Sequence, residues 1–307
     1  MTRGKRRLAR CVALALSWCG AWLALLGGGL SPSAARAAVP ERYEVDAILD
    51  VERGRVEEHV VVCVAVGEAE REIRLWLYPD RLGVAPDAME ERSARWIYPG
   101  EVDLGGIEVT RVRVDGREVT ATRIPLGAGD ADARSERSRG TGGSDLVVPI
   151  EPGPSRTVVL TMDAILDVPG RFGRLGHAAS RLSLAAPWYP LVLDGEAWNQ
   201  PARHRIHARA EHGVLVADDG VVATERTLER DTAYVPLLAA PRLVARRGAL
   251  EGGRRLVVVD HGAAYVPPPR SAEGELGLED LAGIDRLALL REAANDLVRT
   301  ATWLGVP

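Results

Sequence analysis

Histidine is the residue type in this chain best suited to bind a metal or move a proton, and the sequence contains six. None of them begins a His-Glu-x-x-His segment, the helical pattern that binds zinc and supplies a general base. His204, His207 and His212 lie close together, but side chains three apart on a strand over 205–210 would point to opposite faces. We therefore predict no metal ligands and no catalytic residues in this chain.

A small set of residues remains as candidates for ligand binding. They are a strand-end pair, one histidine after a glycine-rich segment, and three aromatic residues: Asp260, His261, His177, Trp188, Tyr189 and Trp198. Functional groups often follow a buried strand in α/β proteins, although a hydrogen-bonded strand end is the alternative for the pair. The glycines of 170–176 match neither a dinucleotide fingerprint nor a P-loop. The aromatic residues would suit a carbohydrate surface, and core packing is the alternative.

The N-terminus has the pattern of an export signal. Five basic residues stand within the first ten, and an uncharged apolar run follows from Cys11 to Leu30. Ala35-Arg36-Ala37 then offers small residues for cleavage, so we expect a signal peptide over 1–37. Because the run approaches the ~20 residues that span a bilayer, an uncleaved anchor is the alternative. Both readings place the rest of the chain outside the cytoplasm, in the periplasm or secreted.

The charge balance excludes one class of partner. The signal holds six of the 39 Lys and Arg residues and none of the 43 Asp and Glu residues, which leaves a net charge of about −10 on the mature chain. Nucleic-acid binding depends on clustered positive charge, so we expect no nucleic-acid partner. Membrane contact is expected only through the N-terminal segment, if it is not cleaved.

The region 38–250 has the pattern of an antiparallel β-sandwich. Short segments with one apolar face alternate with Gly, Pro and Asp turns, and Asp115-Gly116 favours a tight hairpin. A second pair of strands is expected around Pro152-Gly153-Pro154. Residues 127–143 contain little to bury and indicate a mobile loop. The expected strands are 43–49, 55–66, 72–77, 107–114, 118–124, 146–150, 157–166, 205–210, 213–217, 221–226 and 233–238.

Residues 251–307 change character. Leu256–Val259 is apolar throughout, as in a strand buried on both faces, and a Pro-rich linker follows over 263–277. An amphipathic helix is then predicted over 287–304, with apolar residues three or four apart. The fold class expected is therefore mainly β: an antiparallel sandwich followed by a strand, a Pro-rich linker and a C-terminal amphipathic helix. These last elements either open a second domain or fold back onto the sandwich.

The sequence resembles the gluzincin zinc aminopeptidases, the membrane alanyl aminopeptidase family. The segments that carry the resemblance are 43–51, 55–66, 74–79, Asp167-Val168-Pro169-Gly170, Pro187-Trp188-Tyr189-Pro190, Trp198, Asp219-Gly220, Pro241-Arg242-Leu243 and 289–307. The first eight are similar to the N-terminal β-sandwich of the family. The last is similar to the helix that opens its catalytic domain.

The resemblance implies a non-catalytic domain that packs against a zinc peptidase domain and walls its substrate cleft. The family's zinc ligands, Glu base, Gly-x-Met-x-Asn strand and oxyanion-stabilising Tyr have no counterpart in this sequence, so zinc is expected only in a catalytic domain that is missing here. Where the family binds the substrate's amine, this chain has Gly176, His177 and Ala178. The implied partner is a peptidase catalytic domain, or another protein, bound through the helix at 287–304. The alternative is a free-standing extracytoplasmic β-sandwich module for binding or adhesion.

Overall fold

The computed structural model describes residues 38–83, 97–98, 100–124, 144–178, 180–193, 200–249 and 255–260. The described chain is mainly β-structure in several sheets, as the sequence predicts. The signal peptide, the 127–143 loop, the Pro-rich linker and the C-terminal helix lie outside these residues. No helix within the described ranges is long and apolar enough to cross a membrane.

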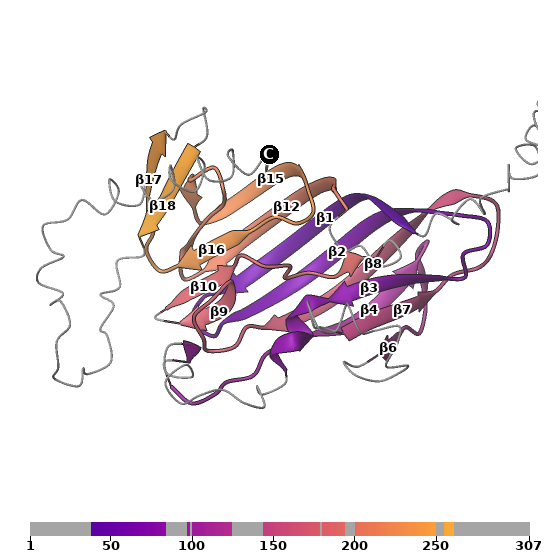
Figure 1. The fold of residues 1–307 in the computed structure, drawn as a ribbon, viewed down its shortest axis with the longest axis horizontal. Coiled ribbons are helices and arrows are strands. Elements are labelled where there is room, and N and C mark those ends of the chain that lie inside the picture. The colour runs from indigo at the N-terminus through magenta and orange to yellow at the C-terminus, as the bar shows by residue number, and fades with distance from the viewer. Residues whose placement is uncertain are drawn as a thin grey trace, which may run out of the picture. The chain divides into compact units, whose positions relative to one another are not determined.

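The largest sheet has seven strands (Figure 1). In spatial order these are β15 (Glu225–Thr232), β12 (Ala202–Glu211), β1 (Val39–Asp50), β2 (Arg55–Val66), β8 (Arg156–Asp167), β4 (Gly106–Val114) and β5 (Arg117–Glu118). All neighbours are antiparallel except β1 and β12, which run parallel. The expectation of a purely antiparallel sandwich is therefore wrong at this one pair. The long stretch of chain between β1 and β12 makes such a crossover connection sterically feasible.

Two smaller sheets accompany the large one. The first contains β14 (Val222–Ala223), β13 (Val214–Val216), β16 (Leu237–Ala240), β10 (Arg181–Leu184) and β9 (Leu175–Ala178). The second contains β11 (Leu191–Val192), β3 (Glu72–Leu77), β7 (Ser144–Pro149) and β6 (Thr122–Ile124). A short 3₁₀ helix, η1 (Tyr78–Leu82), follows β3. A separate hairpin is formed by β17 (Val244–Ala249) and β18 (Arg255–Asp260).

One hydrophobic core joins the large sheet to both smaller sheets. Strands β1, β2 and β8 alternate between buried and exposed positions along almost their whole length. Leu49, Val60 and Leu160 belong to the buried set and are 0% exposed. They pack in the same cluster as Leu75 of β3 and Leu182 of β10. Burying each such side chain stabilises the fold by roughly 1.5–3 kcal/mol relative to exposure.

Two features of the strand pairing differ from the sequence prediction. Strand β7 does not pair with β8: β7 lies between β3 and β6, and β8 lies between β2 and β4. Pro152 and Pro154 lack the N–H group that a ladder needs, so the segment crosses between sheets instead. The expected strand 118–124 is divided into β5 and β6, which belong to different sheets. Asp115 and Gly116 do form the expected tight turn, with φ of 49° and 81°.

Strand β18 also corrects a prediction. The apolar run Leu256–Val259 was expected to be buried on both faces, but within the described part of the chain it pairs only with β17, in an antiparallel hairpin. Residues Val257–Val259 are only half-buried. Pairing with one strand does not cover the faces of a hairpin, because its side chains project above and below the plane in which the two strands pair.

Candidate functional site

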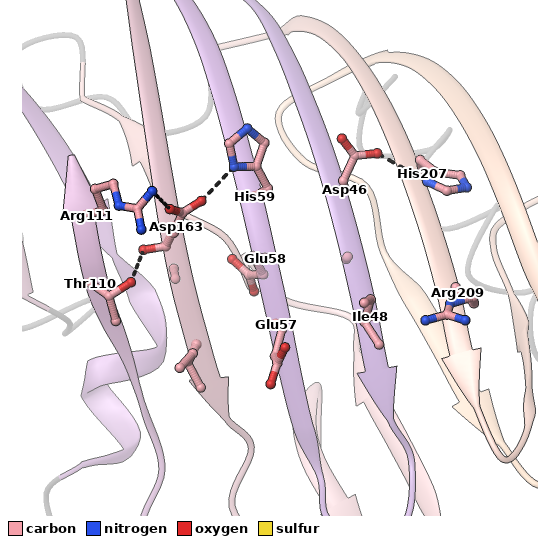
Figure 2. Close-up of a pocket in the computed structure, with 13 residues that line it drawn as sticks. Asp46, Ile48, Glu57, Glu58, His59, Thr110, Arg111, Asp163, His207 and Arg209 are labelled. Carbon is pink, nitrogen blue, oxygen red and sulfur yellow. Dashed lines mark hydrogen bonds and ion pairs between the residues drawn. The ribbon is translucent and has the colours of Figure 1, made fainter. Parts of the chain in front are cut away.

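The outer face of the seven-stranded sheet carries a hollow with a volume of about 590 Å³ (Figure 2). Residues from β1, β2, β4, β8 and β12 line it, and most of them are the alternate positions that point away from the core. Ala47, Glu58 and Ala164 also border it, although they are buried positions on the core side of their strands. The volume falls within the range of small-molecule pockets, roughly 300–1,000 Å³. The hollow is therefore the first candidate for a site in the described part of the chain.

One cross-strand row of charged side chains runs along the hollow. The strand register places His207, Asp46, His59, Asp163 and Arg111 side by side on five neighbouring strands. The carboxylates alternate with the basic groups, so each acid stands between two potential cations. Nδ1 of His59 lies 2.7 Å from Oδ1 of Asp163, and the other oxygen of that carboxylate lies 3.4 Å from Nη1 of Arg111. Figure 2 shows Asp163 linked to both His59 and Arg111, and Asp46 linked separately to His207.

A β-bulge brings Arg111 into this row. Val109 pairs with Ala164 and Arg111 pairs with Asp163, so Thr110 is an extra residue in β4. Thr110 and Arg111 are both exposed, and the Thr110 hydroxyl donates to the backbone oxygen of Asp163 at 3.2 Å. A bulge of this kind turns two successive side chains toward the same face.

His207 stands between two carboxylates. Its Nε2 lies 2.9 Å from Oε1 of Glu225, and its Nδ1 lies 3.2 Å from Oδ1 of Asp46. The hydrogen bond to Glu225 raises the pKa of the imidazole, with a smaller contribution from Asp46, against the opposing effect of desolvation. The protonated ring can donate from both nitrogens at once, which explains why two acceptors stabilise it.

The chemistry of the hollow suits binding better than bond cleavage. His59 is oriented by Asp163 as a general base would be, but the residues lining the hollow include no Ser or Cys to serve as a nucleophile. Its one hydroxyl, on Thr110, is bonded to a backbone oxygen. Across the described residues, no three His, Cys, Asp or Glu side chains are grouped so that they could hold a metal ion.

The sequence prediction that His204 and His207 face opposite sides of their strand is confirmed. His207 lies on the outer face, whereas His204 is completely buried. His204 stacks on Tyr43 with ring centroids 4.5 Å apart, and Tyr189 contacts its Nδ1. Burial lowers the pKa of His204 to about 4, because the charged imidazolium loses its solvation.

The aromatic candidates Trp188 and Tyr189 lie in the core and are 0% exposed. Nε1 of Trp188 donates to the backbone oxygen of Val235 at 2.8 Å. The Tyr189 hydroxyl accepts from the N–H of Val235 at 3.1 Å. The structure thus places both residues at packing positions and away from the hollow.

The remaining sequence candidates are dispersed. His177 lies on β9, and its ring occupies the space where Gly54 lacks a side chain: Cγ lies 2.7 Å from an ideal Cβ at that glycine. Asp260 is the last residue of β18. His261 and Trp198 lie outside the described residues. The structure does not bring the described members of this set together at the hollow.

Among the described residues, none of those predicted from the sequence as binding candidates lines the hollow, yet the sequence contains signals for it. In 107–114 the apolar residues Val109 and Val112 are three apart, which breaks the two-residue period and marks the bulge. Ile48 stands between two other apolar residues on β1, so one of the three must face outward. The pairing of distant strands, on which the charged row depends, is not encoded in any short motif.

The chain resembles some solved structures at low sequence identity. No family model and no curated protein matches this sequence. The chain is similar to the solved structure of a two-domain M1 zinc metallopeptidase bound to L-tryptophan, at 16% identity and a TM-score of 0.42, over 78% of this chain and 51% of that one. It is also similar to yeast LTA4 hydrolase in complex with bestatin, at 12% identity and a TM-score of 0.41, over 71% of this chain and 32% of that one. This chain therefore spans about half or a third of the length of these structures.

Proposed function

We propose that this chain is the non-catalytic N-terminal domain of an exported zinc aminopeptidase-like protein. In this role it packs against a catalytic domain and walls one side of a substrate cleft. The supporting observation is that five of the segments that carry the sequence resemblance, 43–51, 55–66, 74–79, 167–170 and 187–190, contribute residues to one core. The Tyr43 hydroxyl accepts a hydrogen bond from the N–H of Val192 at 2.9 Å, directly after the Pro187–Pro190 motif. Strand β11 pairs with β3, which places Leu191 opposite Trp76.

In this proposal, the catalytic residues belong to a separate domain and not to this chain. A zinc hydrolase needs three protein ligands, a bound water and a general base. The sequence contains no His-Glu-x-x-His segment to supply them. The helix expected over 287–304 is the proposed contact with the catalytic domain, and zinc would bind there and not in this chain. The proposed location is outside the cytoplasm, with the segment 1–37 as signal or anchor.

The test begins with the genomic DNA around the codon for Pro307. We expect a His-Glu-x-x-His segment in one of the downstream reading frames. The encoded catalytic region should then bind this chain when the two are expressed together, as measured by co-purification and by a fixed stoichiometry in sedimentation. The chain alone should release no amine from an aminoacyl p-nitroanilide, with or without added zinc. Absence of the zinc motif downstream, or hydrolysis by the chain alone, would contradict the proposal.

A second function, a free-standing extracytoplasmic binding module, is favoured by one observation: the hollow on the outer face of the large sheet. The two functions differ in the behaviour of the purified chain. A free-standing module should be a monomer with its C-terminal helix docked. A domain separated from its partner should expose the apolar stripe of 287–304 and self-associate, because large exposed apolar patches mark interaction surfaces. Sedimentation of the chain with and without residues 287–304 separates the two.

A further inference from the structure

Beside the paired charged row, the hollow contains a second row that combines charged and apolar side chains. The strand register places Arg209, Ile48, Glu57 and Ile165 side by side on β12, β1, β2 and β8. Ile48 is 36% exposed, although it is a large apolar residue. Figure 2 shows Ile48 between Glu57 and Arg209, on the floor of the hollow.

The charges of this second row have only weak partners in the described structure. Glu57 has its ion pair with Arg55 of its own strand, at 3.8 Å, and Arg209 has its pair with Glu211, at 3.7 Å. These distances exceed those of charge-assisted hydrogen bonds, about 2.7–2.9 Å. In the neighbouring row Asp163 is engaged by His59 at 2.7 Å. The capacity for a new charged partner therefore lies at Glu57 and Arg209.

We propose that the hollow binds a dipolar ligand that carries an ammonium group and a carboxylate at opposite ends of an apolar stretch. The ammonium group binds Glu57, the carboxylate binds the Arg209 guanidinium, and the apolar stretch lies on Ile48, which stands between them in the strand register. A purely anionic ligand would meet Glu57, and a purely cationic one would meet Arg209. Opposite charges on either side of an apolar residue therefore select a ligand with both signs.

The spacing sets the length of the ligand. Glu57 and Arg209 are separated by two strand spacings, about 10 Å in the plane of the sheet. An extended chain of two residues, or an ω-amino acid of similar length, spans about 7 Å. One charge-assisted hydrogen bond of about 2.8 Å at each end extends this to a little over 12 Å. The side chains of Glu57 and Arg209 are long enough to place their charged ends at this separation above the sheet. This inference concerns the outer face of the sheet alone and does not rest on the aminopeptidase-like function.

The experiment uses the purified, isotope-labelled chain and ε-aminocaproate as the probe, followed by NMR titration. We expect saturable shifts of the Ile48 signals, with a dissociation constant in the millimolar range. Caproate lacks the ammonium group and hexylamine lacks the carboxylate, so each should bind about 3- to 5-fold more weakly, as exposed ion pairs contribute. The dipeptide Leu-Leu forms a second arm, which shows whether peptides or free ω-amino acids are the preferred source of the dipole.

Matched variants locate the two charges. E57Q should weaken binding of ε-aminocaproate but not of caproate, and R209Q should weaken ε-aminocaproate but not hexylamine. E44Q on β1 and R205Q on β12 change equivalent charges outside the hollow and should leave binding unchanged. Absence of saturable shifts at Ile48 would overturn the proposal. Equal binding of the three probes, or equal effects of all four variants, would also overturn it.

Discussion

The hydroxyl oxygen of Tyr189 lies 2.9 Å from Nδ1 of His204, and both side chains are completely buried. Tyr189 already accepts a hydrogen bond from the N–H of Val235, so its own hydrogen is directed to the imidazole. The Tyr43 ring stacks on the His204 ring, with an interplanar angle of 2°. These contacts connect β1, β12 and the segment after β10 in one polar cluster within the core.

Replacing Tyr189 by Phe should destabilise the fold by about 1–3 kcal/mol. The change removes one oxygen and leaves both His204 Nδ1 and the Val235 N–H without that partner in the core. Urea unfolding measures the change in free energy. Tyr78→Phe is the matched control, because its hydroxyl has an exposed contact with Arg81. The control should change stability by less than about 0.5 kcal/mol. Equal effects of the two variants would contradict the role given to Tyr189.

Because of Glu58, the free energy of unfolding should decrease as the pH rises above about 4.5, the ordinary pKa of a Glu side chain. Its side chain faces the core between Ala47 and Ala164, and neither oxygen has a hydrogen-bond partner among the described residues. Burial raises the pKa of Glu58, so the folded state retains a proton that the unfolded state loses. Above its usual pKa the group therefore opposes folding, and this effect vanishes when the unfolded chain is also protonated. A measurement of the melting temperature as a function of pH should show this loss of stability.

Two variants test this effect of Glu58. E58Q should remove the decline in stability toward neutral pH, whereas E57Q, one residue away on the exposed face, should retain it. His204 acts in the opposite sense: its pKa is lowered to about 4, so the unfolded chain takes up protons first as the pH falls from about 6.5. E58Q should therefore reveal a loss of stability on acidification that Glu58 partly offsets in the native chain. A pH profile unchanged by E58Q would contradict the burial of an unpaired carboxyl.

The local pattern predicts strands well but does not predict how they pair. The alternation of 55–66 and the Asp115-Gly116 turn depend on neighbouring residues, and both agree with the structure. The partners of β7 and β8 depend on competition between distant strands, which residue periodicity does not report. The same limit applies to the site. Asp46, His59, Asp163 and His207 meet only because four strands separated by up to 161 positions are in register.

His207 should titrate above the usual histidine pKa near 6.5, because Glu225 and Asp46 both stabilise its charged form. NMR of the ring protons measures this value directly. E225Q should lower the pKa more than D46N does, since the contact with Glu225 is shorter. E229Q, on the same strand but paired with Arg203, should leave it unchanged.

The raised pKa of His207 also makes the stability of the fold depend on pH. A raised pKa means that the folded chain binds the proton more tightly than the unfolded chain does. The stabilisation is thus fully present below about pH 6.5 and is lost as the pH rises through the folded-state value. H207Q should remove this component of the pH dependence. A His207 pKa that does not respond to E225Q would show that the contact is not made in solution.

Gly54 should be intolerant of a side chain for two separable reasons. Its φ of +68° lies in the left-handed region, where Ala costs roughly 1–2 kcal/mol. An added Cβ would also lie 2.7 Å from Cγ of His177. Gly116 is the matched control, with a φ of +81° and no atom within 4 Å of the added Cβ. G54A should therefore destabilise the fold more than G116A does, as measured by urea unfolding. In an H177A background the excess for G54A should disappear, leaving only the backbone cost that both glycines share. If the excess persists without His177, that side chain does not occupy the space beside Gly54.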